Sequence, residues 1–410
     1  MPTTTVLPIL RERRLTTSLV RFRLPVFAFE DFILLAMSPL TLDTLATAVS
    51  TSPSSYPRAK FPPDRAGFQA EVKRRVGEYF QSTGKSERGG WRIYTKTLFV
   101  CSWMIASYLA LVFFSPTLWL AVPLAVSLAA AMAASAFCVQ HDGGHKAYSN
   151  LSWVNKLAAL SLDFIGASSY FWYWKHSVFH HTYSNIPGQD TDIELGAVMR
   201  LCPQQQRRWF HRWQHLYLWV LYGVMAARWH LWGDFKDWMA GSMGPHPIPR
   251  PKGFDLFVFL GCKAFSVGWL IVLPLFYHDW WMVAGFYLFI TGMMGVFLSV
   301  VFQLAHCVEE ADYPSPIEGT LRMENAWAVH QVQTTADFAR TSRLLTFLLG
   351  GLNFQIEHHL MPHICHVHYP ALSPIVEDVC KEYGVRFSSH PTFWAGVVSH
   401  YRWLRHMGRA

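Results

Sequence analysis

The 410-residue chain has little charge and few features of a covalently braced or repetitive protein. Asp, Glu, Lys and Arg make up 15% of its residues, whereas a typical soluble protein has about 25%. The 7 cysteines form an odd number, and no two of them are spaced as C-x-x-C. These absences argue against a disulfide scaffold and a zinc ribbon, and the lack of a fixed repeat argues against a solenoid.

The chain contains four long runs of apolar residues. Each of four runs is close to the roughly 20 residues that a helix needs to cross a bilayer. Only a short turn separates the two runs of each pair, which predicts two antiparallel transmembrane hairpins. We therefore predict an all-α integral membrane fold with one domain over residues 61–410. The four predicted spans are residues 97–114, 117–139, 256–277 and 280–304.

The first part of the chain has no pattern of a packed domain. Residues 1–60 are predicted to form a poorly ordered N-terminal extension. The stretch up to Phe32 is rich in Arg and poor in acids, which resembles a transit peptide. Translated sequence upstream of a true start at Met37 explains the same stretch equally well, so both interpretations remain open.

The distribution of Lys and Arg predicts the orientation in the membrane. The turns at 115–116 and 278–279 contain neither residue, whereas the other connecting segments contain many. By the positive-inside rule, both termini and the central segment face the cytosol. We predict a multi-pass protein of a bacterial inner membrane, or of the endoplasmic reticulum in a eukaryote. The net charge of +8 then reflects membrane topology, and no nucleic-acid partner is expected.

The segment between the hairpins is only partly polar. Residues 157–173 and 216–227 are apolar but carry or adjoin charged residues, and we predict that they form helices lying on the membrane surface. Lys263 is the one Lys or Arg inside a predicted span, and we expect its side chain to reach the cytosolic interface.

The 20 histidines are the most informative residues, because several of them are clustered. His141 and His145 are four residues apart, as are His176 and His180, so each pair shares one face of a helix. His181 is turned by about 100° from His180, which predicts a second ion. A further cluster begins at residue 355, and another histidine ends the fourth span. The remaining predicted ligands are His306, Gln355, His358 and His359.

These ligands exceed what one tetrahedral site uses, and the topology puts all of them on one side of the membrane. We therefore predict a cytosolic histidine-rich metal cap that holds two ions and in which no further side chain is catalytic. Imidazole binds Zn, Cu, Fe and Ni alike, so the spacing leaves the metal open. Carboxylates close to the ligands are candidates for orienting the imidazoles. These candidates are Asp142, Glu357, Asp190 and Asp192.

The histidine motifs resemble those of the integral-membrane fatty acid desaturase family in order and in position relative to the hairpins. Gln355 at the start of the third motif resembles the front-end, Δ6-type branch, and residues 176–193 resemble bacterial linoleoyl-CoA-desaturase-like members. The resemblance implies that the seven motif histidines bind two non-haem irons, with His306 and Gln355 at further ligand positions. Phe302 stands where a related branch has an asparagine. The seven motif histidines are His141, His145, His176, His180, His181, His358 and His359.

The resemblance implies an O2-dependent reaction that inserts a cis double bond into a fatty acyl chain. The chain lacks the His-Pro-Gly-Gly motif of a fused cytochrome b5 domain, so electrons are expected from a separate ferredoxin or from cytochrome b5 with its reductase. Expected partners are the acyl substrate and membrane lipid. A hydroxylase or ketolase acting on lipid at the same site is the alternative. A non-enzymatic membrane metal carrier or haem electron-transfer protein is a more distant one.

Overall fold

The computed structural model of the protein describes residues 58–115, 117–194 and 196–410. Met37 and nearly all of the predicted extension over residues 1–60 lie outside the described residues. The described part belongs to one compact unit, Thr51–Ala410.

Four helices of this unit are long and apolar enough to cross a membrane, which confirms the predicted all-α membrane class. Helix α4 covers Trp91–Phe114, and α16 covers Trp280–His306. The other two spans, Leu118–Gly144 and Gly253–Leu275, each consist of several helical stretches in sequence. All four begin and end within six residues of the predicted spans. The stretches of the second span are α5 (Leu118–Ser135), η1 (Ala136–Gln140) and α6 (His141–Gly144), and those of the third are α14 (Gly253–Val267), η5 (Gly268–Val272) and α15 (Leu273–Leu275).

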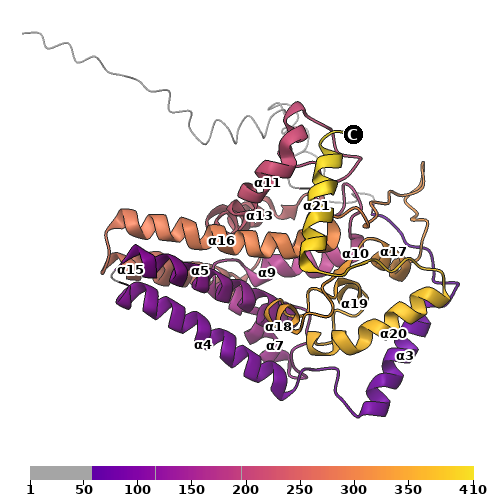
Figure 1. The fold of residues 1–410 in the computed structure, drawn as a ribbon, viewed down its shortest axis with the longest axis horizontal. Helices are drawn as coiled ribbons and strands as arrows, with labels where there is room; N and C mark the ends of the chain where they lie inside the picture. The colour runs from indigo at the N-terminus through magenta and orange to yellow at the C-terminus, as the bar shows by residue number, and fades with distance from the viewer. Residues whose placement is uncertain (1–57, 116, 195) are drawn as a thin grey trace, which may run out of the picture. The chain divides into compact units, whose positions relative to one another are not determined.

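The spans differ in how much protein surrounds them. The second and fourth spans are 67% and 56% buried over their most apolar windows, whereas the first and third are only 22% buried. Helix α5 packs between α4 and α16, as Figure 1 shows. The second and fourth spans therefore form the inner pair, and α4 and α14 leave most of their side chains to the lipid.

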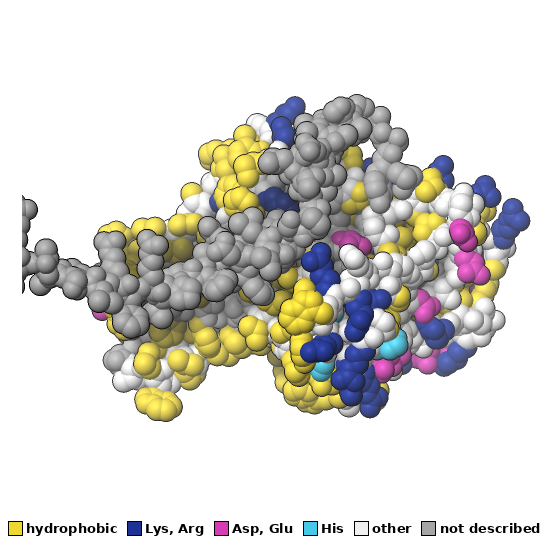
Figure 2. Space-filling model, turned by 90° about the horizontal axis from the view of Figure 1, so that it is seen from above, with side chains coloured by type: hydrophobic (Ala, Val, Ile, Leu, Met, Phe, Trp, Pro, Cys, Tyr) yellow, Lys and Arg dark blue, Asp and Glu magenta, His cyan; other side chains and the backbone are white. Residues whose placement is uncertain are grey.

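Many of the remaining helices gather near the end of the spans where α5 and α16 both finish, while α11 and α13 lie alongside α16 (Figure 1) and α12 packs on it. Within this cap, α3 packs on α20, α17 on α19, and α21 on α11 and α16. Lys, Arg, Asp and Glu also concentrate at this end in the described part of the face in Figure 2. The cap helices are α3 (Phe68–Thr83), α7 (Ser152–Ala159), α8 (Ser161–Phe164), α9 (Ser169–Trp172), η2 (Tyr173–His180), α10 (His181–Tyr183), η3 (Trp209–Trp213), α11 (Gln214–Tyr222), α12 (Val224–Arg228), η4 (Trp229–Gly233), α13 (Asp234–Ala240), α17 (Trp327–Gln333), α18 (Arg343–Leu348), α19 (Gln355–Leu360), η6 (His366–His368), α20 (Tyr369–Glu382) and α21 (Phe393–Met407).

Strands are minor in the described residues. Strands β1 (Ser242–Met243) and β2 (His246–Pro247) pair antiparallel. Strands β3 (Asp337–Phe338) and β4 (Ser389–His390) pair parallel, with Asp337 opposite Ser389. The second pair joins the segment before α18 to the segment before α21.

The apolar stretch 157–173 is not one surface helix as predicted. It is divided among α7, α8, α9 and the first residue of η2, and Asp163 within α8 turns inward. The Asp163 side chain is buried, and its Oδ2 accepts a hydrogen bond from the backbone N–H of Ser169 at 3.0 Å. Gly166 between them has a φ of 105°, which lies in the region that favours glycine. The stretch 216–227 lies within α11 and α12, which both pack on α16.

The prediction that Lys263 reaches the interface is wrong. Its side chain is buried, with 6% of the residue exposed, and its Nζ lies 2.7 Å from Asp234 Oδ2. The same ammonium donates to the carbonyl oxygens of Gly166 at 2.6 Å and Trp229 at 2.8 Å. Because its partners come from α13 and from two turns of the central segment, this contact ties the third span to the cap.

Candidate metal centre

The predicted ligand histidines converge into two adjoining groups at the cap end of the spans. In the first group, the nearest ring nitrogens of four histidines all lie within 4.8 Å of one another, and the second group contains three histidines by the same measure. The members come from α6, η2, α16 and α19 and from the residue after α6. The first group is His141, His145, His176 and His358, and the second is His180, His306 and His359.

The distances between these nitrogens suit shared metal ions. His141 Nε2 lies 3.2 Å from His176 Nε2, and His180 Nε2 lies 3.3 Å from His306 Nε2. Two imidazole nitrogens bound at about 2.1 Å to one ion, with angles of roughly 90–110°, are about 2.9–3.4 Å apart. The Nε2 atoms of His145, His358 and His359 are buried without a hydrogen-bond partner. A buried nitrogen of this kind is costly unless something binds it, so the residues fit metal ions.

The second histidine motif keeps the predicted neighbours His176 and His180, which offer ring nitrogens within 4.8 Å of each other, and adds a second pairing. His176 Nε2 lies 3.3 Å from His181 Nε2, whereas His180 turns to the other group and meets His306. The reason is that η2 is a π-helix, in which the backbone N–H of His181 bonds to the carbonyl of His176. In this wider helix, residues five apart share a face. His181 also lies close to His358 and His359, between the two groups.

Two glycines let the first motif pack closely against the central segment. A Cβ atom on Gly143 would lie 2.6 Å from the backbone nitrogen of Ala159, and one on Gly144 would lie 2.2 Å from Trp172 Cζ3. The Trp172 ring in turn stacks on His176, with centroids 4.7 Å apart. Larger residues at these positions would push the first and second motifs apart.

The second nitrogen of several rings has its own acceptor, which orients the ring. His180 Nδ1 lies 2.9 Å from Asp190 Oδ2, and His359 Nδ1 lies 2.8 Å from Gln331 Oε1. His306 Nδ1 lies 3.3 Å from the Thr334 carbonyl oxygen. When Nδ1 donates to such an acceptor, the lone pair of Nε2 is left for a metal. The sequence did not indicate Gln331 or Thr334, because they lie far from the motifs along the chain.

Burial keeps most of these imidazoles neutral. It lowers the pKa of His145, His176, His358 and His359 well below the usual value, and neighbouring histidines lower each pKa further. His180 differs: burial lowers its pKa, but the Asp190 carboxylate more than offsets this and raises it. Neutral imidazole is the form that binds a metal, so a site of this composition is ready to bind at neutral pH.

Two of the four predicted orienting carboxylates contact a ligand histidine. Asp190 bonds to His180 as described, and Asp192 Oδ2 lies 3.8 Å from the same Nδ1 while its Oδ1 pairs with Lys175 at 2.7 Å. The Asp142 carboxylate accepts from His366 Nδ1 at 2.8 Å and from Cys365 Sγ at 2.9 Å, and its role in orienting a ligand histidine stays a prediction. This carboxylate therefore joins the first motif to the loop after α19.

The Glu357 carboxyl group lies close to that of Asp337, and neither of its oxygens has a hydrogen-bond partner among the described residues, so its orienting role stays a prediction. Both side chains are buried, and burial raises the pKa of each, with Glu357 raising that of Asp337 further. Asp337 Oδ1 accepts the backbone N–H of Ile356 at 3.0 Å. Asp337 thus holds the start of α19, which carries the third motif, and sequence spacing did not reveal this contact.

Gln355 and Phe302 border the second group. The Gln355 Nε2 donates to the Leu352 carbonyl oxygen at 2.9 Å, and the side chain also interacts with His306. The Phe302 ring lies 4.8 Å from the His306 ring and 5.1 Å from the His180 ring, measured between centroids. Where the related branch has an asparagine, this chain therefore has an apolar wall.

We expect Asp190→Asn to weaken metal binding about 10–100-fold, the usual cost of losing an outer-shell partner. Both carboxylate oxygens of Asp190 accept hydrogen bonds: Oδ2 from His180 Nδ1 and the Asn185 backbone N–H, and Oδ1 from the Asp192 backbone N–H. Asparagine has a single side-chain oxygen, so it cannot accept at both positions. Loss of iron to a chelator, followed over time in the purified protein, measures the effect. Asp192→Asn is the matched control, because Asp192 is farther from the ring, and equal loss in both variants would contradict the assignment.

Comparison with known proteins identifies similar chains. A family model described as fatty acid desaturase matches residues 117–391. The sn-1 linoleoyl-lipid 6-desaturase of Arthrospira platensis is 36% identical over 343 residues, covering 83% of this chain and 92% of that protein. The enzyme of the same name from Synechocystis sp. is 36% identical over 357 residues, covering 86% and 98%. An acyl-lipid (8-3)-desaturase of Physcomitrium patens is 35% identical over 345 residues, covering 83% and 72%. All nine predicted ligand residues lie inside the matched stretch.

Proposed function

The chain belongs to the fatty acid desaturase family, and from that premise we propose that it inserts a cis double bond near the carboxyl end of an acyl chain carried by a membrane lipid. The proposed site holds two non-haem irons, with O2 as cosubstrate. The names of the relatives from A. platensis and Synechocystis, linoleoyl-lipid 6-desaturases, support both the lipid carrier and the position of the double bond.

The observation that carries the proposal is the pair of histidine groups with buried, unpartnered Nε2 atoms. When bound there, two irons and O2 supply an oxidant strong enough to remove hydrogen from an unactivated C–H bond, which no amino-acid side chain can do. In the balanced reaction the acyl chain loses two hydrogens. O2 accepts these with two electrons and two protons from outside, and two molecules of water form.

The residues of the chain position the ions and exclude water. One ion is assigned to the group containing His141 and the other to the group containing His180, with His181 between them. Asp190 and Gln331 keep the rings oriented through Nδ1. Because the surrounding side chains are buried, little solvent reaches the reacting carbon atoms, which protects a reactive oxidant from side reactions.

The height of the site supports oxidation close to the carboxyl end. His141 and His306 lie near one end of two 27-residue spans, which at about 1.5 Å per residue are longer than the roughly 30 Å hydrocarbon core. At this depth, the carbon atoms of a bilayer lipid that reach the ions are those nearest its ester group.

We infer that the cap and both termini face the cytosol, since neither short turn between spans contains Lys or Arg. Electrons would then come from a cytosolic ferredoxin or from cytochrome b5 with its reductase. The Lys and Arg side chains at the cap end in Figure 2 suit an acidic carrier of this kind.

The test is to express the protein in a host that lacks polyunsaturated fatty acids, supply linoleate, and analyse lipids by mass spectrometry. A product lighter by two hydrogens, with its new double bond on the carboxyl side of the existing ones, is expected. A product heavier by one oxygen would instead indicate a hydroxylase or ketolase. No product, together with a haem Soret band in the purified protein, would indicate electron transfer.

A further inference from the structure

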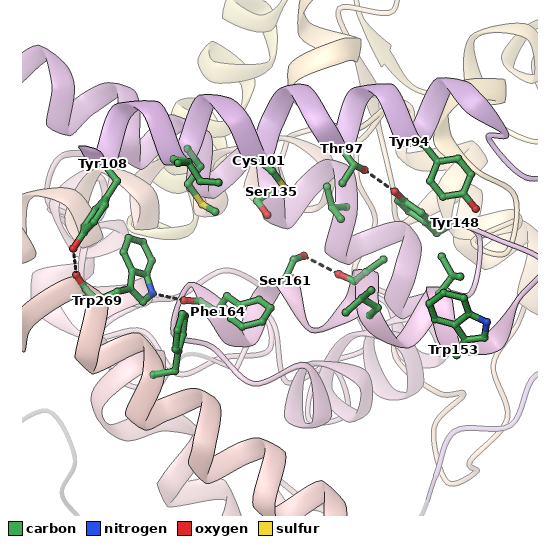
Figure 3. A pocket seen from close by; sticks show the side chains of 17 residues that line it. Tyr94, Thr97, Cys101, Tyr108, Ser135, Tyr148, Trp153, Ser161, Phe164 and Trp269 are labelled. Carbon is green, nitrogen blue, oxygen red and sulfur yellow. Dashed lines mark hydrogen bonds between the residues drawn. The ribbon is translucent and has the colours of Figure 1, made fainter. Parts of the chain in front are cut away.

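An elongated apolar cavity of about 790 Å³ lies between α4, α5, the α7–α8 segment and the third span. Figure 3 shows its lining, with Tyr108 and Trp269 at one end and Tyr94 and Trp153 at the other. Val139, two residues before His141, lines it. Ala158 lines it too, and a Cβ on Gly143 of the first histidine motif would lie 2.7 Å from the Ala158 Cβ. The cavity therefore abuts the helix end that carries the first motif.

The cavity is open to the side. Ile105 on α4 is 55% exposed, Leu157 on α7 is 56% exposed and Phe265 on α14 is 53% exposed, and all three line it. Helices α4 and α14 are the two outer spans, so their exposed faces meet lipid. An acyl chain can therefore enter from the bilayer without passing through water, which would be costly for a long apolar chain.

One end of the cavity lies at headgroup level. Tyr94 and Trp153 there are exposed, and the neighbouring Trp91 and Arg92 at the start of α4 are exposed as well. Tyr and Trp side chains prefer the membrane interface. A lipid with its head at this end would lay its tail along α4, past Val139 on the helix that carries the first histidine motif.

The other end is closed by a hydrogen-bonded pair of aromatic residues. Tyr108 Oη donates to the Trp269 carbonyl oxygen at 2.5 Å, and Trp269 Nε1 donates to the Phe164 carbonyl oxygen at 2.8 Å. Beyond this closure lies a second cavity of about 150 Å³, and Tyr108 lines both. From Tyr94 to Tyr108 the helix rises about 21 Å at about 1.5 Å per residue, a length that suits the greater part of an extended acyl chain.

We propose that this groove receives the acyl chain of a bilayer glycerolipid from the side and that Tyr108, closed against Trp269, sets the longest tail it holds. The inference rests on the proposed desaturase function and adds the route of entry and the residue that limits chain length. It commits to a lipid in the membrane as the occupant, in contrast to a thioester delivered from the cytosol.

The first test fills the groove. Cys101 points into its middle (Figure 3), and Cys101→Trp is expected to lower kcat/KM for the lipid substrate at least about tenfold, as loss of pocket space for several methylenes does. Leu109→Trp on the same helix is the matched control, because Leu109 is exposed but does not line the groove. Bound iron should stay unchanged in both variants.

The second test does not depend on turnover. A phosphatidylcholine whose acyl chain ends in a diazirine is mixed into bilayer nanodiscs with the purified protein and irradiated. Cross-links are expected at Met104, Ile105 and Trp269, and Cys101→Trp should lower their yield several-fold. An acyl-CoA with the same diazirine serves as the second arm. Cross-links from acyl-CoA alone, or labelling of Leu109 as strong as that of Ile105, would overturn the proposal.

The third test opens the closed end. Tyr108→Ala joins the two cavities, and the ratio of kcat/KM for a longer acyl chain to that for the preferred chain should rise about tenfold. Tyr108→Phe keeps the ring and should leave the ratio unchanged. If the wild-type protein desaturates lipid and neither Cys101→Trp nor Tyr108→Ala alters rate or chain length, the groove proposal is wrong while the proposed function stands. If the wild-type protein did not desaturate any lipid, the proposed function itself would be wrong.

Discussion

Replacing His180 with alanine is expected to abolish desaturation and to lower bound iron from two ions per chain to about one. His180 Nε2 faces His306 Nε2 at 3.3 Å, and the His359 ring lies 5.0 Å from the His180 ring between centroids. Removing this imidazole leaves the second group too few nitrogens to hold an ion. The loss of activity should exceed the roughly 10–100-fold that follows loss of an outer-shell partner.

Two measurements decide this prediction: iron per chain by elemental analysis and product by mass spectrometry. His359→Ala should behave in the same way, because it belongs to the same group. His406→Ala is the control, since His406 is exposed on α21. Retention of two irons with normal turnover in His180→Ala would refute the assignment, whereas loss of membrane insertion would show a folding defect that the His406 control does not share.

Replacing Lys263 with methionine is expected to cost about 3–5 kcal/mol of stability, the usual effect of removing one partner from a buried ion pair. Methionine fills a similar volume but leaves Asp234 without its ammonium partner at 2.7 Å, and it also leaves the carbonyl oxygen of Gly166 without its donor. Unfolding of the detergent-solubilised protein, followed by tryptophan fluorescence on heating, measures the loss.

A second substitution separates charge from packing. In the double variant that combines Lys263→Met with Asp234→Asn, no unpaired carboxylate remains. Much of the stability lost in Lys263→Met should therefore return. Asn keeps an oxygen for the backbone N–H of Ser168, which Asp234 Oδ2 accepts at 2.7 Å. If Lys263→Met alone leaves the unfolding temperature unchanged, the ammonium does not hold the third span to the cap, contrary to its observed contacts.

The spans and the ligand residue types were predictable because they depend on local sequence. A run of about 20 apolar residues favours a membrane helix wherever it occurs, and the observed helices confirm this for all four runs. The spacing of His141 and His145 likewise predicts a shared helix face, and both residues belong to the first group.

Other features were not predictable because they depend on a change of helix type or on distant partners. The pairing of His176 with His181 follows from the π-helical turns of η2, which the spacing of histidines does not reveal. Asp142 lies inside the first motif but bonds to His366, more than two hundred residues later in the chain. Lys263 stays buried because Asp234 meets it from the central segment.

Taken by itself, the sequence determined that the protein is a helical membrane protein of the desaturase family with a histidine-rich site at one end of its spans. Hydrophobic run length and short-range spacing are local properties, so they can be recognised in the sequence without knowledge of the fold. Only the tertiary structure decided which imidazoles lie together, which groups orient them, and where an apolar groove runs. These depend on contacts between segments far apart in the chain, and packing alone brings such segments together.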